Sequence, residues 1–400
     1  MYKYIFISLW FGALVMPFMG IKGAVITSIA IAGGWITFSL FTTSNLLSHI
    51  KNIIPFIKPS LGASHKKISL NKRSILFANL SLLLIFLALP NFLNNYYIDV
   101  LTLAGMYAVL ALGLNIVIGL AGLLDLGYIS FYAVGAYTYA LLSTKFGVSF
   151  WFALPIGGLL ATFFGLLIGI ITLRLRGDYL AIVTLGFIQI VHIVLNNWDG
   201  LTGGPNGILG IARPRIGSFV FNQPIHFYYL ILAILVITII AVHRLNNSRT
   251  GRAWIAIRED EIAAEAMGID TIRMKCLAFS LGAFWAGIAG VFFAGKFAFV
   301  SPESFTFMES VLVLSMVVLG GMGSIPGVII GALTLIILPE ILRGLANYRM
   351  LIFGAMLVIM MIARPQGLIG SQRRKIELHP DDEKTYVQEM ESLYDMEKMR

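Results

Sequence analysis

The chain has 400 residues, of which 58% are hydrophobic and only 12% carry a charge. A soluble domain carries about twice that charged fraction, so the composition excludes an ordinary soluble protein. The formal net charge is +9, but the basic residues lie beside apolar runs, and we predict no nucleic-acid partner. The single cysteine, Cys276, allows no internal disulfide.

Apolar runs recur along the chain and indicate its fold class. Each is about 18 residues or longer, the length that a helix needs to cross a hydrocarbon core of roughly 30 Å. Helices satisfy their own backbone hydrogen bonds there, and the runs lack the strict alternation of a transmembrane barrel. We therefore predict an all-α integral membrane protein, a polytopic helical bundle of about 10–12 transmembrane segments in a lipid bilayer.

Charge indicates the orientation of the first region. Residues 1–98 contain Lys and Arg but no acid, and most of these basic residues fall in one loop, 51–73. Basic loops mark the cytoplasmic side, which places this loop and the N-terminus inside. We assign 1–98 to extra N-terminal transmembrane segments around that basic loop. The expected spans are about 4–20, 24–41 and 75–92.

Residues 99–370 form the expected core. Its spans are predicted at about 99–118, 127–144, 150–173, 179–197, 226–243, 276–299 and 349–363, with Arg174, Arg176 and Arg364 inside. Residues 310–339 carry no charge and are too long for one upright crossing, and a glycine-rich stretch, Gly320–Gly327, interrupts them. Two crossings and a re-entrant pair of half-helices both fit this pattern. The charged tail, 371–400, is expected to be a mobile cytoplasmic segment.

We find no catalytic constellation and no metal-ligand cluster in the sequence, so we predict neither an enzyme nor a cofactor. One stretch, Gly290–Lys296, has the spacing of a phosphate-binding loop, but Phe297 stands where that loop needs Ser or Thr. No strand is expected before it. We interpret the match as chance spacing within an apolar span.

Glycine and polar residues interrupt two of the apolar runs. Such residues are poor choices for a helix facing lipid, and they fit a bend that lines a protected cavity. They are Asn115, Gly119, Gly122, Asp125 and Gly127 in the first run and Gly320, Gly321 and Gly323 in the second. We interpret both groups as a possible translocation path or helix break. Asp125 could line a path, cap a half-helix or lie at the interface. Elsewhere Gly165 and Gly169, four residues apart, predict close helix packing.

A polar island, Arg249–Gly268, lies between two apolar runs. Asp260 fits a helix N-cap, Glu261 suits the first turn and Gly268 is a natural stop, so we predict a short helix over 261–267. Its small side chains suit a partner's groove better than lipid. A second, turn-rich segment comprises Thr202, Gly203, Gly204, Pro205 and Asn206. That segment either docks a partner outside or connects two spans.

Several stretches are similar to one protein family. They are Gly113–Tyr137, Leu173–Gly207, Gly251–Gly268, Phe299–Phe307, Val318–Gly323 and Arg364–Leu368. On these stretches the chain resembles the LivM-type permease subunits of bacterial branched-chain amino-acid ABC importers. The similarity covers the expected core, 99–370, and more loosely the N-terminal segments.

The resemblance implies a type II importer permease fold in the bacterial cytoplasmic (inner) membrane. It also implies three kinds of partner: a second homologous permease subunit, two cytoplasmic ABC ATPase subunits, and a periplasmic amino-acid-binding protein that delivers Leu, Ile or Val. The segment Thr202–Asn206 would then be a periplasmic docking site.

The resemblance further implies a cytoplasmic coupling helix near 252–268. ABC importers often carry Glu-Ala-Ala-x-x-x-Gly in that helix. Here Ala263, Ala264 and Gly268 fit, whereas Ile262 occupies the first position and Glu261 stands one residue early. ATPase coupling is therefore assigned to Arg252, Arg258, Glu259, Asp260, Glu261, Ala263, Ala264, Glu265 and Gly268.

Two alternatives stay open at this point. A related permease for urea, amides or other amino acids would share the architecture. An ion-coupled secondary transporter would show interacting ionisable residues at mid-membrane, for which Asp125 and His192 are the candidates.

Overall fold

A computed structural model describes residues 86–91, 93–171, 177–341, 354, 358 and 367–368, all within one unit of the chain, Ser81–Arg400. Several predictions fall wholly or largely outside these residues. They are the spans at 4–20, 24–41, 75–92 and 349–363, the basic loop 51–73, the arginines at 174, 176 and 364, and the tail 371–400.

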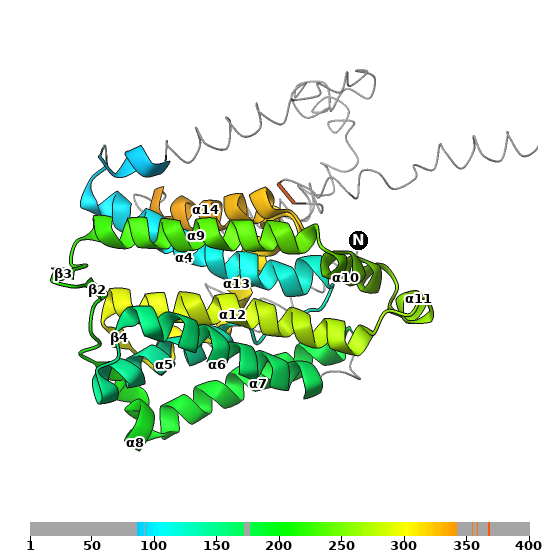
Figure 1. Cartoon of the computed structure of the whole chain (residues 1–400), viewed down its shortest axis with the longest axis horizontal. Coiled ribbons are helices and arrows are strands. Elements are labelled where there is room, and N and C mark those ends of the chain that lie inside the picture. Colours follow the sequence, from blue (N-terminus) through cyan, green and yellow to red (C-terminus); the bar gives the residue numbers. More distant parts are fainter. Residues whose placement is uncertain are drawn as a thin grey trace, which may run out of the picture. The chain divides into compact units, whose positions relative to one another are not determined.

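Helices make up most of the described part of the chain (Figure 1). They are α4 (Asn95–Asn115), α5 (Ile129–Phe146), α6 (Phe150–Ile171), α7 (Asp178–Asn197), α8 (Asp199–Thr202), α9 (Pro224–Asn246), α10 (Arg249–Glu259), α11 (Glu261–Ala266), α12 (Thr271–Phe297), α13 (Phe307–Gly320) and α14 (Ile325–Ile341). Short turns are η1 (Leu89–Asn91), η3 (Gly204–Asn206), η4 (Pro302–Ser304) and the π-helical η2 (Ile116–Leu120). Two antiparallel strand pairs join β1 (Ile208–Leu209) to β4 (Phe299–Val300) and β2 (Arg215–Ile216) to β3 (Phe219–Val220).

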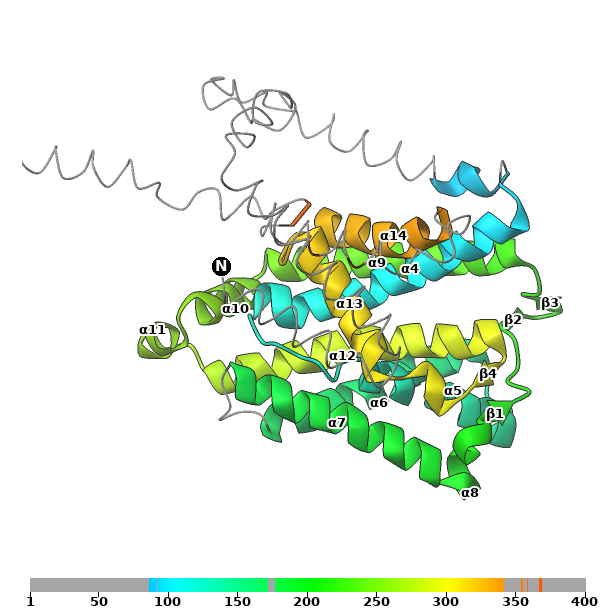
Figure 2. The same cartoon turned by 180° about the vertical axis from the view of Figure 1, so that it is seen from behind.

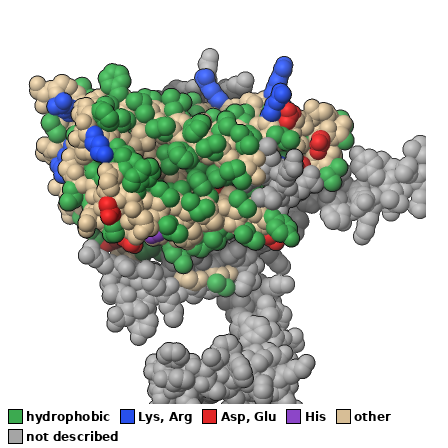
Figure 3. Space-filling view, turned by 90° about the horizontal axis from the view of Figure 1, so that it is seen from below, with side chains coloured by type: hydrophobic (Ala, Val, Ile, Leu, Met, Phe, Trp, Pro, Cys, Tyr) green, Lys and Arg blue, Asp and Glu red, His purple; other side chains and the backbone are tan. Residues whose placement is uncertain are grey.

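Within the described residues, six stretches are long and apolar enough to cross a membrane. They are Asn95–Leu120, Phe150–Ile171, Asp178–Asn197, Pro224–Asn246, Thr271–Phe297 and Pro302–Gly320. The first five confirm spans predicted from the sequence, while the predicted total of about 10–12 also includes segments outside the described residues. Figure 3 shows one face of the molecule, with apolar side chains across its middle and charged side chains toward its two ends.

Helix α5 lies at its predicted place but is less apolar than those six stretches. Tyr132, Tyr137 and Tyr139 interrupt its apolar sequence. Most of its residues are buried, and it packs against α6 and α12. Because neighbouring helices enclose it, α5 does not need a continuous lipid-facing surface.

Helices α4 and α12 form the centre of the bundle, and most of their residues are buried. Helix α6 packs against α12 and α5, while α7 packs against α5 and α13, and both expose large apolar side chains, among them Phe152 and Ile182. Gly165 and Gly169 bring α6 close to α12, facing Ala283 and Cys276 respectively. The close packing predicted from their spacing is confirmed.

The uncharged run 310–339 contains two helices, α13 and α14, which pack against each other (Figure 2). They meet at a turn, residues 321–324, so the interruption predicted at Gly320–Gly327 is confirmed. Gly321 and Gly323 adopt φ angles of 111° and 81° in this turn, which other residues rarely tolerate. Together with η4, α13 is long enough to cross a membrane, and α14 is a shorter apolar helix.

Candidate functional site

The second half of the polar island forms the predicted short helix, α11. The Asp260 side chain caps it, since Oδ1 accepts hydrogen bonds from the backbone N–H groups of Ile262 and Ala263 at 2.9 and 3.0 Å. Gly268 follows the helix with a φ of 84°. The cap and the stop are thus confirmed, and the helix ends at Ala266, one residue earlier than predicted.

The first half of the island forms α10, so the coupling helix that the resemblance implies near 252–268 is divided into two helices, α10 and α11. Ser248 caps it by accepting a hydrogen bond from the Gly251 N–H at 3.1 Å. Trp254 is fully buried, its Nε1 donates to the Met274 carbonyl at 2.7 Å, and Ile257 is buried one turn further on. The capping serine followed by two apolar residues three positions apart was the available signal.

One acidic residue of the island is held inside the chain. Glu261 Oε1 lies 2.6 Å from Nζ of Lys275 in α12, and the two side chains are 19% and 5% exposed. Ala264 of α11 is also buried. These contacts fix α11 against the start of α12. They also occupy the carboxylate of Glu261, the acid nearest to the glutamate position of the importer pattern.

The opposite face of α11 is open. Ile262 and Met267 are 66% and 84% exposed, and Ala263, Glu265 and Gly268 are exposed beside them. We call these five residues the α11 outer face. Exposed apolar side chains beside small residues and one acid are typical of a surface that receives another protein.

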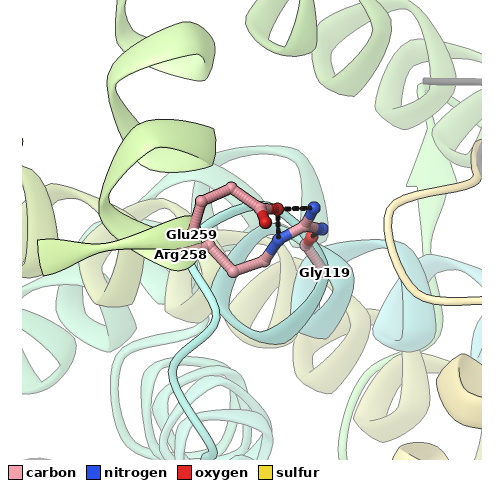
Figure 4. A network of polar contacts seen from close by, with 3 residues as sticks. All are labelled: Gly119, Arg258 and Glu259. Carbon is pink, nitrogen blue, oxygen red and sulfur yellow. Dashed lines mark hydrogen bonds and ion pairs between the residues drawn. The ribbon is translucent and has the colours of Figure 1, made fainter. Parts of the chain in front are cut away.

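Arg258 connects the island to the first helix break. Its Nη1 donates to the Gly119 carbonyl at 2.7 Å, and its Nε and Nη2 both point at Oε1 of Glu259, at 3.3 and 2.7 Å (Figure 4). The Arg258 side chain is 17% exposed. Its aliphatic part lies directly over Gly122, where a larger residue would collide with it. The two groups that the sequence analysis predicted separately therefore touch.

Asn115 connects the first break to the second. Its Oδ1 accepts a hydrogen bond from the Gly323 N–H at 2.8 Å, and Gly119 packs against both residues. Residues 115 and 323 are far apart in the sequence, so periodicity and spacing could not have predicted this contact.

Asp125 lies between η2 and α5 and is only 1% exposed. Its Oδ1 accepts from the Gly127 N–H at 2.8 Å, and its Oδ2 has no hydrogen-bond partner among the described residues. The Asp125 carboxylate thus closes a local turn ahead of α5, whose N-cap is Tyr128 and has no side-chain cap bond. Its role in a path stays a prediction. His192 also has a buried ring nitrogen, Nδ1, without a partner in the described part.

The turn-rich segment lies at the other end of α12. Thr202 is buried and its hydroxyl donates to the carbonyls of Leu195 and Trp198, whereas Pro205 and Asn206 are exposed. The following strand, β1, pairs with β4 through Ile208 and Val300. The fold thus joins two of the stretches that carry the family resemblance, Leu173–Gly207 and Phe299–Phe307.

Long apolar helices around a buried centre, two helix breaks at one end and a polar, capped segment beside them define a multi-pass membrane protein. The chain belongs to the family described as the branched-chain amino acid transport system permease component, whose model matches residues 96–361. It is a permease component of an ABC transporter for branched-chain amino acids.

The relatives agree with this assignment. The LivM high-affinity branched-chain amino acid transport system permease protein of Escherichia coli K12 is 44% identical over 81% of this chain and 80% of its own length. The LivH permease protein of the corresponding system in Salmonella typhimurium is 28% identical over 67% of this chain and 92% of its own length. A probable branched-chain amino acid transport permease protein LivM of Methanocaldococcus jannaschii is 26% identical over 66% of this chain and 90% of its own length. No solved structure matches the chain.

Proposed function

We propose that this permease imports leucine, isoleucine or valine through a bacterial cytoplasmic (inner) membrane by alternating access. Two separate ATPase subunits supply the energy, and a second, homologous permease forms the other half of the path. Similarity to relatives named both LivM and LivH supports such a pair. A periplasmic amino-acid-binding protein supplies the substrate.

The α11 outer face is the observation that carries the coupling proposal. It combines exposed Ile262 and Met267 with small residues, on a helix fixed to α12 by the Lys275–Glu261 pair. A helix fixed in this way transmits a push from an ATPase to the membrane helices as a rigid-body movement. Glu265 is the exposed acid of this face, so it replaces Glu261 as the proposed acidic contact.

The proposed orientation puts α10 and α11 in the cytoplasm together with both chain termini. The concentration of arginines in Arg249–Gly268 supports this placement by the positive-inside rule. The turn Thr202–Asn206 then faces the periplasm, where exposed Pro205 and Asn206 contact the binding protein.

The test uses the complete importer in proteoliposomes, with ATP on the side of α11 and the binding protein loaded with labelled leucine on the other. Glu265→Arg places a cation on the α11 outer face without touching the Lys275–Glu261 pair. We expect more than about a tenfold loss of leucine uptake and of ATPase subunits retained on purification, because a reversed interface charge is strongly unfavourable.

Glu303→Arg is the matched control, because it makes the same charge change at an exposed position on the opposite end of α12. It should leave the retention of ATPase subunits unchanged. Normal ATPase retention and uptake by Glu265→Arg would refute the coupling assignment. Uptake by the unaltered complex that is independent of ATP would refute the importer itself.

A further inference from the structure

Two helix breaks meet at one point of the bundle. The first is η2, where α4 ends in a π-helical turn and the Ala121 N–H bonds back to the Ile116 carbonyl. The second is the turn between α13 and α14. Hydrogen bonding of Gly323 N–H to Asn115 Oδ1 joins them directly. π-Helical turns occur frequently at functional sites.

Arg258 is the side chain of α10 that reaches this meeting point. One arm of its guanidinium, Nη1, donates to the Gly119 carbonyl inside η2, while the other two nitrogens are held by the Glu259 carboxylate. Lysine could not hold both partners in this way, because its ammonium is a point charge without a planar fork. Figure 4 shows the guanidinium between these two acceptors.

The space around Arg258 is closed. Gly122 lies under the aliphatic part of Arg258, and Gly119 lies against Asn115 and Gly323. Neither glycine position has room for a side chain. A displacement of α10 must therefore move the guanidinium, the η2 backbone or both, since closely packed groups transmit displacement.

The junction also has an unsatisfied donor. Asn115 is fully buried, and its Nδ2 has no hydrogen-bond partner among the described residues, although its Oδ1 is engaged. A buried donor without a partner costs free energy and calls for an explanation. This Nδ2 group is available to a new acceptor when η2 rearranges.

We propose that Arg258 is the positioning residue that transmits movement of the α10–α11 segment to the joined breaks at η2 and 321–324. The inference rests on the proposed coupling function and extends it from the surface to the interior. Movement of α10 pulls on the Gly119 carbonyl, and the Asn115–Gly323 bond carries the change to the turn between α13 and α14.

The experiment measures leucine imported per ATP hydrolysed by the reconstituted importer. Arg258→Met keeps the aliphatic part over Gly122 and removes the guanidinium. We expect the ATPase subunits to be retained and to hydrolyse ATP, while the import ratio falls about tenfold, the effect of losing one charge-assisted hydrogen bond. Arg258→Lys, which restores the charge and reaches one partner, should recover part of the ratio.

The control and the second variant separate this inference from the function on which it rests. Arg249→Met removes an exposed arginine of the same helix, one not assigned to coupling, and should leave the ratio unchanged. Glu259→Ala removes the acceptor of Nε and Nη2 without altering the core and should lower the ratio even if Arg258→Met fails to accumulate. An unchanged ratio in either Arg258→Met or Glu259→Ala overturns the inference, whereas an unaltered complex without ATP-driven uptake overturns the proposed function instead.

Discussion

Helix α12 carries a lysine near each end, and each lysine pairs with an acid of another helix. At one end, Lys275 and Glu261 are 5% and 19% exposed and lie 2.6 Å apart. At the other end, Lys296 and Asp99 are 11% and 49% exposed and lie 2.9 Å apart. In both pairs the lysine is the more shielded partner, but water reaches the acid of the second pair more readily, so the second pair should contribute less to stability.

The two ends of α12 are held in different ways. The end with α10 and α11 fixes a polar segment by two caps, a buried tryptophan and a shielded ion pair. The opposite end relies on short strand pairs and turns, and it leaves Pro205 and Asn206 open. Rigidity at the first end suits transmission of a movement.

Trp254→Ala should give the largest effect, because it removes the anchor of α10. Replacing a fully buried tryptophan by alanine costs about 3–5 kcal/mol, and the Met274 carbonyl also loses its donor. Denaturation of the purified protein in detergent measures the loss. Arg252→Ala, on the exposed side of the same helix, is the control and should change the free energy of unfolding little. Equal stabilities would show that α10 is not anchored here.

Glu261→Gln should have the next largest effect. It leaves the Lys275 ammonium shielded without its carboxylate, which we expect to cost about 2–3 kcal/mol, below the value for a fully buried pair. The double variant Glu261→Gln with Lys275→Met should recover most of this loss in the same denaturation assay, because no charge then stays unpaired. A double variant as unstable as the single one would contradict the role of the pair.

Asp99→Asn should have the smallest effect, below about 1 kcal/mol, because its carboxylate is half exposed. The loss should also shrink further as salt is added, whereas that of Glu261→Gln should persist. Denaturation at low and high ionic strength distinguishes the two. If the loss of stability in Asp99→Asn did not depend on salt, the Lys296–Asp99 pair would be as shielded from water as the Lys275–Glu261 pair.

Local signals explain what the sequence could predict. Apolar length predicts spans such as α6 and α9, and capping chemistry predicts α11, because Asp260 bonds to residues two and three positions later. Glycine content predicts the turn at 321–324. Helix α10 was not predicted from local signals, because only two of its buried residues, Trp254 and Ile257, are large and apolar.

Contacts between distant parts of the chain could not be predicted in the same way. The bond from Arg258 to Gly119 joins residues separated by 139 positions, and that from Gly323 to Asn115 by 208. Each donor has many chemically equivalent acceptors, and the packing of α4, α10 and α13 decides among them. For the same reason, sequence could not tell that Glu261 turns inward while Glu265 stays outside.

The exposed Ile262 and Met267 also have a consequence for biogenesis. Under the proposed coupling, a newly inserted copy presents these side chains to water until an ATPase subunit covers them, and exposed apolar patches promote aggregation. Synthesis of this chain in excess of its partner subunits therefore leaves copies that are prone to aggregate. Under the proposed coupling, Ile262 in α11 and Met267 just after it make balanced production of the subunits necessary.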